Sequence, residues 1–259
     1  MRVNEFTKNC EEAKGKPIVS ASWPPITVLV YTYNRPMMIR QVLPSLQEHL
    51  HYSGELLWRI ADDGSPPGYL EDIAAEFPEL NLEWTVTKRL GFGANANKGY
   101  RACATKYVLP TEDDLLIARG IDLDAGITLM NGVPTIGALR FGAAVIDTVL
   151  LGRAFMGPPP MGYYIFDRAR SKYWNPCGHP TLIRPSLYKA YGYLPENVAV
   201  GLVEMDWTAK AKGPGPEVAI LPQYLGGYPF VHLGSGNRLG GTEKDAGWMI
   251  SKGKKPKGR

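Results

Sequence analysis

The sequence predicts an α/β fold, a Rossmann-like, mostly parallel sheet flanked by helices with a smaller irregular second half. Short β-prone apolar runs alternate with segments of helical spacing along residues 26–109. The links between them are short, as in strand–helix–strand units with right-handed crossovers. The first run is apolar without interruption, as in strands covered on both faces. With 259 residues, 44% of them hydrophobic, the chain can form one such domain with a real core.

The first strand is expected at residues 26–31, with the sequence ITVLVY. The residues that follow it, Asn34, Arg35 and Pro36, are signals for a turn and a helix start. Apolar residues then recur at helical spacing as far as Leu50. Pro44 lies within this pattern and is expected to kink or shorten the helix.

The same alternation continues along the chain. Further strands are expected at 56–61, 82–86 and 107–109, and helices at 69–77 and 94–105. The second half is less regular. Helices are expected there at 185–191 and 203–212, whereas residues 152–164, rich in Gly, Pro and Met, are expected to form a mobile loop.

The termini differ in composition from the predicted domain. We expect a leader over residues 1–25, one domain over 26–245 with halves at 26–117 and 118–245, and a disordered basic tail over 246–259. Residues 252–259 carry five cations and no acid, and subtracting these five from the net charge of +4 leaves −1 for the rest. The tail is either a solvated terminus or a contact for nucleic acid or another acidic surface.

Several classes of protein are disfavoured by composition. No apolar stretch is long enough to span a bilayer, and the polar N-terminus lacks the apolar centre of a signal peptide. The three cysteines, Cys10, Cys103 and Cys177, are widely spaced and are expected to be reduced thiols. We therefore expect a soluble, cytoplasmic protein.

Residues 111–114, with the sequence TEDD, carry the strongest chemical signal. They follow the apolar run 107–109, so three carboxylates leave a buried strand together. Such carboxylates repel one another and are costly to desolvate, and a divalent cation such as Mg²⁺ or Mn²⁺ removes that cost. The alternative is a solvated helix N-terminus, where acids are also favoured.

Polar motifs follow each of the predicted strands of the first half. Ligands of parallel α/β sheets bind beyond the carboxyl ends of the strands. One nucleotide-sized site is therefore expected from the segments 31–34, 62–63, 89–93 and 112–114.

Taken in order, these motifs resemble the family 2 glycosyltransferases with a GT-A fold. The resemblance covers roughly residues 26–238. It rests on seven segments: 28–36 (VLVYTYNRP), 61–65 (ADDGS), 91–99 (GFGANANKG), 111–114 (TEDD, where the family has its DxD motif), 177–188 (CGHPTLIRPSLY), 201–207 (GLVEMDW) and 231–236 (VHLGSG).

The resemblance implies a role for each group of residues. A divalent metal, Mn²⁺ or Mg²⁺, would be held by Asp114, together with Glu112 or Asp113 and with His232 as a further ligand. The spaced acidic pair of the motif could be either Glu112/Asp114 or Thr111/Asp113, and the resemblance favours Asp114. Glu204 or Asp206 would be the catalytic base; here the chain departs from the family, because Val203-Glu204 stands in place of Glu-Asp. Asp62 or Asp63 would contact the nucleobase. The nucleotide-sugar site would consist of Tyr31, Thr32, Tyr33, Asn34, Arg35, Asp62, Asp63, Arg89, Gly91, Gly93, Asn97, Glu112 and Asp113.

Several of these residues also have an explanation that involves no function. The Asp62–Ser65 segment is also an ordinary turn sequence, His232 could be a core histidine, and Glu204 and Asp206 could face water.

The resemblance implies a metal-dependent glycosyltransferase with a nucleotide-sugar donor, UDP-linked by preference, acting with inversion. The acceptor would be a glycan or, given the basic tail, a hydroxylated base in DNA that leaves the helix stack. A non-catalytic nucleotide-sugar-binding module is an alternative. A nucleotidyltransferase is disfavoured, because residues 33–36 are not the Gly-rich basic loop that it needs.

Overall fold

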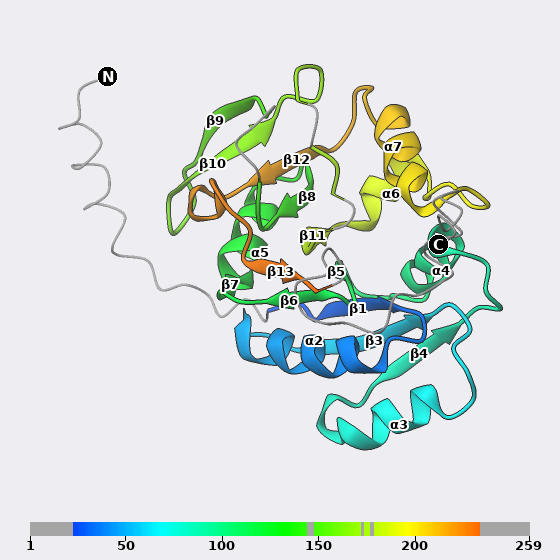
Figure 1. The fold of residues 1–259 in the computed structure, drawn as a ribbon. Coiled ribbons are helices and arrows are strands. Elements are labelled where there is room, and N and C mark those ends of the chain that lie inside the picture. Colours follow the sequence, from blue (N-terminus) through cyan, green and yellow to red (C-terminus); the bar gives the residue numbers. More distant parts are fainter. Residues whose placement is uncertain (1–22, 144–147, 172–173, 177–178, 234–259) are drawn as a thin grey trace, which may run out of the picture.

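The computed structural model describes residues 23–143, 148–171, 174–176 and 179–233. Most of the predicted leader, the basic tail, Cys10 and Cys177 lie outside these residues. The predicted α/β class is confirmed: one nine-stranded mixed sheet is flanked by helices (Figure 1).

The sheet has two differently built halves. Its strand order is β4 (Glu83–Val86), β3 (Leu56–Asp62), β1 (Ile26–Thr32), β5 (Tyr107–Glu112), β11 (Thr181–Ile183), β8 (Ile136–Arg140), β12 (Glu217–Ile220), β10 (Met161–Phe166) and β9 (Leu150–Phe155). The first four strands are parallel, as predicted. Beyond β5 the directions are mixed, since only β8 and β12 pair in parallel there.

The parallel half follows the sequence pattern closely. All seven residues of β1 are buried, because α2 (Pro36–His49) and α3 (Tyr69–Glu76) lie on one side of the sheet and α4 (Phe92–Arg101) on the other (Figure 1). Pro44 neither ends nor shortens α2. Its side chain is exposed, so the carbonyl that lacks a helical partner can be solvated.

The second half contains α5 (Leu123–Gly132), α6 (Pro185–Tyr191) and α7 (Val200–Lys210). The predicted helix at 185–191 is confirmed, and the one predicted at 203–212 begins three residues earlier. Two short 3-10 turns, η1 (Pro78–Leu80) and η2 (Pro222–Tyr224), complete the helical elements of the described residues.

The prediction of a mobile loop at residues 152–164 is wrong. These residues belong to a hairpin of β9 and β10, in which Met161 pairs with Phe155. The proline run occupies only the turn between the strands, and Tyr163 and Ile165 are buried against the core. The Gly, Pro and Met content of this segment concealed its two strands.

Two small ladders complete the fold. β6 (Leu115–Ile117) pairs with β13 (Phe230–His232), and β2 (Leu50–His51) pairs with β7 (Ile121–Asp122). The β6–β13 ladder matters for the site, because it places His232 opposite Leu115, the residue after the acidic segment.

The chain visits β1, β3 and β4 in one direction and then returns to β5 on the other side of β1. This reversal creates a switch point at the carboxyl ends of β1 and β5, where ligands of open α/β sheets bind. Among the described residues, no helix is long and apolar enough to cross a membrane.

Candidate active site

The acidic segment forms the turn between β5 and β6, next to the end of β1. Glu112 is the last residue of β5 and pairs with Tyr31. The amide of Asp113 donates to the carbonyl of Tyr31 (3.0 Å), and the amide of Leu233 donates to the carbonyl of Asp114 (2.7 Å). The backbone therefore fixes all three carboxylates at the switch point.

Arg35 joins two of these carboxylates. Its Nη1 lies 3.0 Å from Oδ1 of Asp113 and 3.0 Å from Oδ2 of Asp114. Burial alone would lower the pKa of Arg35, but the charges of Asp113 and Asp114 outweigh it and raise this pKa above its usual value. The guanidinium is thus a fixed counter-ion for the turn.

Asp113 is an anchor within the fold. Its Oδ2 accepts a hydrogen bond from Thr32 Oγ1 (2.7 Å), whose oxygen also lies 2.6 Å from the hydroxyl of Tyr69. Burial raises the pKa of Asp113 to about 6, against the opposing effect of Arg35. Both oxygens of this carboxylate have partners, which leaves Glu112 and Asp114 as the acids available to a cation.

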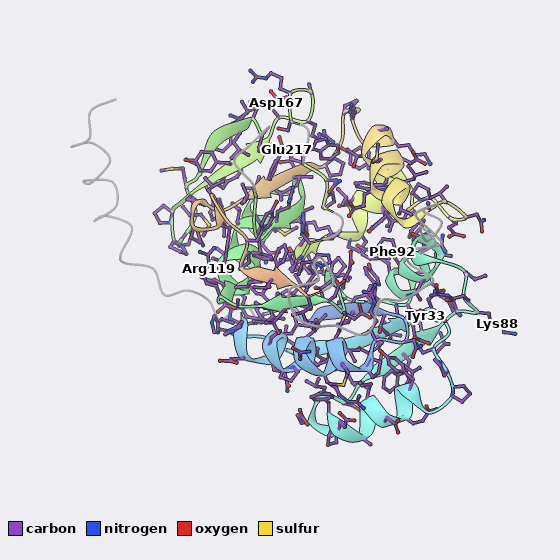
Figure 2. The ribbon with its side chains drawn as sticks, viewed as in Figure 1. Tyr33, Lys88, Phe92, Arg119, Asp167 and Glu217 are labelled. Atoms are coloured by element: carbon purple, nitrogen blue, oxygen red, sulfur yellow. The ribbon has the colours of Figure 1, made fainter. Side chains whose placement is uncertain are left out.

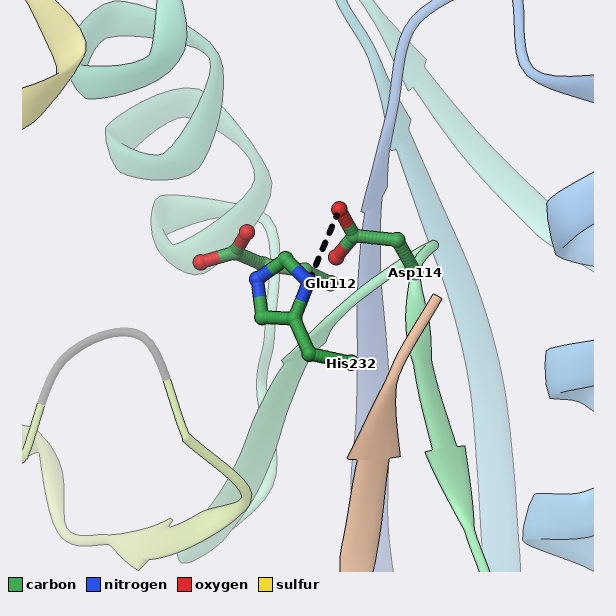
Figure 3. A group of neighbouring side chains, drawn as sticks. All are labelled: Glu112, Asp114 and His232. Atoms are coloured by element: carbon green, nitrogen blue, oxygen red, sulfur yellow. Dashed lines mark ion pairs between the residues drawn. The ribbon is translucent and has the colours of Figure 1, made fainter. Parts of the chain in front are cut away.

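Glu112, Asp114 and His232 form a candidate metal site (Figure 3). One possible ligand atom from each residue lies within 4.8 Å of those of the other two, and Figure 3 shows the imidazole between the two carboxylates. Nδ1 of His232 lies 3.7 Å from Oδ2 of Asp114. Oδ1 of Asp114 is buried without a hydrogen-bond partner. Two carboxylates and an imidazole suit a divalent cation such as Mn²⁺. The buried oxygen of Asp114 that has no hydrogen-bond partner adds to this match, because a cation would satisfy it.

The electrostatics of Glu112 agree with this fit. Burial, followed by the charges of Asp114, Glu204 and Asp113, raises the pKa of Glu112 to about 8. A bound cation would favour the charged carboxylate and reverse this effect.

The carboxylates of Asp62 and Asp63 accept hydrogen bonds from neighbouring groups of the protein. Oδ2 of Asp62 accepts hydrogen bonds from the amides of Gly64 (3.0 Å) and Ser65 (2.8 Å), and its Oδ1 accepts from the Ser65 hydroxyl. Asp63 accepts from Thr87 Oγ1 (2.6 Å) and from two amides of the loop after β4. The turn interpretation of this motif therefore describes Asp62 well, and Asp63 organises the neighbouring loop.

Arg89 and Tyr33 form a stacked pair near the Asp62–Ser65 turn. The guanidinium carbon of Arg89 lies 3.1 Å from the ring centroid of Tyr33. Figure 2 shows Tyr33 and Phe92 on the same side of the molecule, with Asp167 and Glu217 toward the β9–β12 end. Asn34 is exposed, and its backbone amide donates a hydrogen bond to Ser65 Oγ (2.8 Å). Gly91 has φ 88° and donates its amide to Asp63.

Gly93 and Asn97 face another part of the protein. A Cβ at Gly93 would lie 2.0 Å from the carbonyl oxygen of Pro195. The Asn97 side chain is buried and bonds to Leu194 and Glu196. The structure thus brings these two residues to the segment before α7 instead of the acidic turn.

Glu204 and Asp206 lie on different sides of α7. Residues two apart on a helix differ by about 200° in direction. Val203 and Trp207 are buried, Glu204 is half-buried, and Asp206 is exposed. Glu204 is close enough to Glu112 for its charge to raise the pKa of Glu112. Burial raises the pKa of Glu204 itself, against the opposing charge of Arg140.

Two residues near the site were not predicted. Arg140, at the end of β8, is buried and interacts with Glu204; the only signal in the sequence is a cation that ends an apolar run. His179 lines a cleft together with Tyr31, Glu112 and Tyr188. It belongs to segment 177–188, which carries part of the resemblance, but that segment gave His179 itself no role.

Comparisons with known proteins agree with this architecture. The family model for glycosyl transferase family 2 matches residues 27–192, more than half of the chain. Among curated proteins no sequence matches significantly.

Solved glycosyltransferase structures are similar in fold. The mannosyltransferase PcManGT from Pyrobaculum calidifontis, in complex with GDP-Man and Mn²⁺, is 18% identical with a TM-score of 0.58, and the alignment covers 96% of this chain and 68% of that one. Residues 1–349 of S. aureus TarS, in complex with UDP-GlcNAc, are 18% identical with a TM-score of 0.56, covering 76% of this chain and 56% of that one. The chain spans only part of each protein, and at this identity the likeness shows the fold alone.

Proposed function

The chain belongs to glycosyl transferase family 2, as its motifs predict, and from this premise we propose that it transfers a sugar from a nucleotide-sugar to an acceptor hydroxyl with the help of a divalent cation. The observation that supports the cation is the cluster of Glu112, Asp114 and His232 at the switch point between β1 and β5. Oδ1 of Asp114 supplies the buried, unsatisfied oxygen that such a cation needs.

Glu112, Asp114 and His232 would hold Mn²⁺ or Mg²⁺, which acts as a Lewis acid on the leaving diphosphate. Arg35 orients the Asp114 carboxylate through its 3.0 Å contact with Oδ2. Since Oδ2 is held in this way, Oδ1 remains for the cation. Mn²⁺ accepts both carboxylate and imidazole ligands, which makes it the better match to this set.

The stacked pair of Tyr33 and Arg89 fits the nucleoside end of the donor. A flat guanidinium and an aromatic ring at the rim can contact a nucleobase and an adjoining phosphate. The carboxylates of Asp62 and Asp63 would shape this rim through their loops, since their oxygens already accept hydrogen bonds. We propose a nucleoside diphosphate donor, with UDP-linked and GDP-linked sugars as the first to test.

Glu204 is the proposed base. Its half-buried position and its raised pKa suit a carboxylate that takes a proton from the acceptor hydroxyl. The acceptor oxygen then bonds to the anomeric carbon while the bond from that carbon to the diphosphate breaks. A single displacement of this kind inverts the anomeric centre. Asp206 is exposed and would not take part.

The acceptor is proposed to be a saccharide hydroxyl. A hydroxylated DNA base depends on the basic tail, which lies outside the described residues. A DNA-binding measurement against salt, with and without residues 252–259, separates the two, because phosphate contacts weaken steeply as salt rises.

The metal is tested with the purified protein, UDP-GlcNAc or GDP-Man, and Mn²⁺. We expect sugar transfer or donor hydrolysis to stop with EDTA and to return with Mn²⁺. Asp114→Asn should lower the rate by at least about 10²-fold, because the charge that holds the cation is lost. Glu217→Gln, on β12 in the mixed half of the sheet, is the matched control and should leave the rate unchanged (Figure 2). Full activity of D114N in EDTA would overturn the metal role.

A further inference from the structure

One helix, α4, touches both sides of the site. At its start, the amide of Gly91 donates to Asp63, which organises the loop after β4. Along its length, α4 packs against α7, the helix that carries Glu204. We call the loops after β1, β3 and β5 the donor side, and residues 192–210 the base side. The packing of α4 therefore sets how far apart these two sides lie.

Asn97 binds the backbone of the base side at two points. Its Nδ2 donates to the carbonyl of Leu194 (2.9 Å), and its Oδ1 accepts from the amide of Leu194 (3.0 Å). The same Nδ2 donates to Oε1 of Glu196 (2.8 Å). Because the Leu194 amide can only donate, the orientation of the Asn97 side chain is fixed. Both hydrogens of the Asn97 side-chain amide are used in these bonds, so Asn97 has none left to donate to a nucleotide-sugar.

Gly93 makes the close approach possible. A Cβ at this position would lie 2.0 Å from the carbonyl oxygen of Pro195, so any side chain would push the segment away. About two turns further on, the guanidinium of Arg101 stacks on the ring of Tyr193 at 4.1 Å. The contacts of Gly93, Asn97 and Arg101 follow one face of α4, as their helical spacing requires.

The segment held by Asn97 is tied in turn to α7. Nε1 of Trp207 donates to the carbonyl of Gly192 (2.9 Å). Trp207 is buried and lies one turn after Glu204 on the same helix. A shift of residues 194–196 would therefore move the helix that carries the carboxylate.

We propose that Asn97 is a positioning residue that holds the base Glu204 at its working distance from the donor, and that it does not bind the donor. This inference depends on the proposed function. It reassigns Asn97, together with Gly93, from nucleotide-sugar binding to the connection between the two sides of the site.

Asn97→Asp is the first test. The carboxylate that it introduces still accepts from the Leu194 amide but faces the Leu194 carbonyl and Glu196, so the segment should shift. We expect kcat to fall by on the order of 10²-fold, the usual effect of displacing a catalytic group by about 1 Å. The affinity for nucleoside diphosphate with Mn²⁺, measured by calorimetry, should be unchanged.

The double variant N97D/E196Q should recover part of the lost kcat, because the new amide can donate to the new carboxylate. Lys98→Ala, on the exposed side of α4, is the control and should match the wild type. If N97D does not fold, Glu196→Ala removes the partly exposed bond to Asn97 and the 3.9 Å surface contact with Arg101, and it leaves both bonds between Asn97 and Leu194 in place. It should lower kcat by about threefold with KM for the donor unchanged.

Hydrogen exchange gives a readout without turnover. In N97D the Leu194 amide should exchange faster than in the wild type, whatever the activity. Weaker nucleotide binding with an unchanged kcat would overturn the proposal, as would an unchanged kcat with an unprotected Leu194 amide. Failure of the wild type to transfer any sugar would instead overturn the proposed function and leave the exchange result standing.

Discussion

The donor side and the base side are held in place by different interactions. On the donor side, buried carboxylates bind amides, hydroxyls and Arg35 within the loops themselves. On the base side, α7 is held through Trp207, Tyr188 and the contact of residues 194–196 with α4. Charges therefore organise the first, and packing the second. We expect substitutions on the donor side to affect stability and cation binding, and those on the base side to affect the rate.

The largest expected effect separates Glu204 from Asp206. Glu204→Gln should lower kcat by roughly 10²- to 10⁴-fold, the usual contribution of a general base. Asp206→Asn should leave kcat near the wild-type value, because Asp206 is exposed on another side of α7. Steady-state rates with one donor and saturating Mn²⁺ measure both. A loss in D206N equal to that in E204Q would contradict the assignment.

Arg35→Met tests the role of charge on the donor side. The substitution leaves the buried carboxylates of Asp113 and Asp114 without their counter-ion. We expect the free energy of unfolding in EDTA to fall by about 3 kcal/mol. Urea denaturation measures it.

Arg40→Met is the matched control for that measurement. Arg40 lies on α2 and pairs with Glu76, but at the surface, where ion pairs contribute little. We expect a much smaller change in the urea midpoint. Equal losses in the two variants would show that burial of the acidic turn has no special weight.

Gly93→Ala tests the packing contact of the base side. The added methyl group would overlap the Pro195 carbonyl, which is backbone and cannot rotate away. We expect a loss of about 2 kcal/mol in the free energy of unfolding, typical of overpacking, together with a lower kcat. Gly162→Ala is the control, since the nearest atom to its Cβ would be 4.0 Å away. A stable, fully active G93A would break the link between α4 and α7.

The donor side could largely be predicted from the sequence because its signals are local. A continuous apolar run makes a parallel strand, and the acids that follow it must lie at the sheet edge. The metal cluster required one further fact, the pairing of β6 with β13, which no local pattern encodes. The resemblance supplied His232 in its place.

The base side could not be predicted in the same way. Asn97 and Leu194 lie far apart in the sequence, and no pattern near either residue predicts the hydrogen bonds between them. Glu204 and Asp206 were equivalent until the buried face of α7 was known. The hairpin of β9 and β10 was hidden by Gly and Pro, which mark loops by composition but here occur within and between strands.

The smallest expected effect is the pH dependence of stability on the donor side. The folded pKa of Asp113, about 6, lies above the usual value for an unfolded chain, so the folded state binds more protons between these values. Stability of the metal-free protein should therefore rise as the pH falls from 7 to 5, by about 1 kcal/mol from this group. Asp113→Asn should remove that part of the slope, whereas E204Q should retain it. Urea denaturation in EDTA at several pH values measures the slope, and a D113N slope equal to that of the wild type would show that burial does not govern this carboxylate.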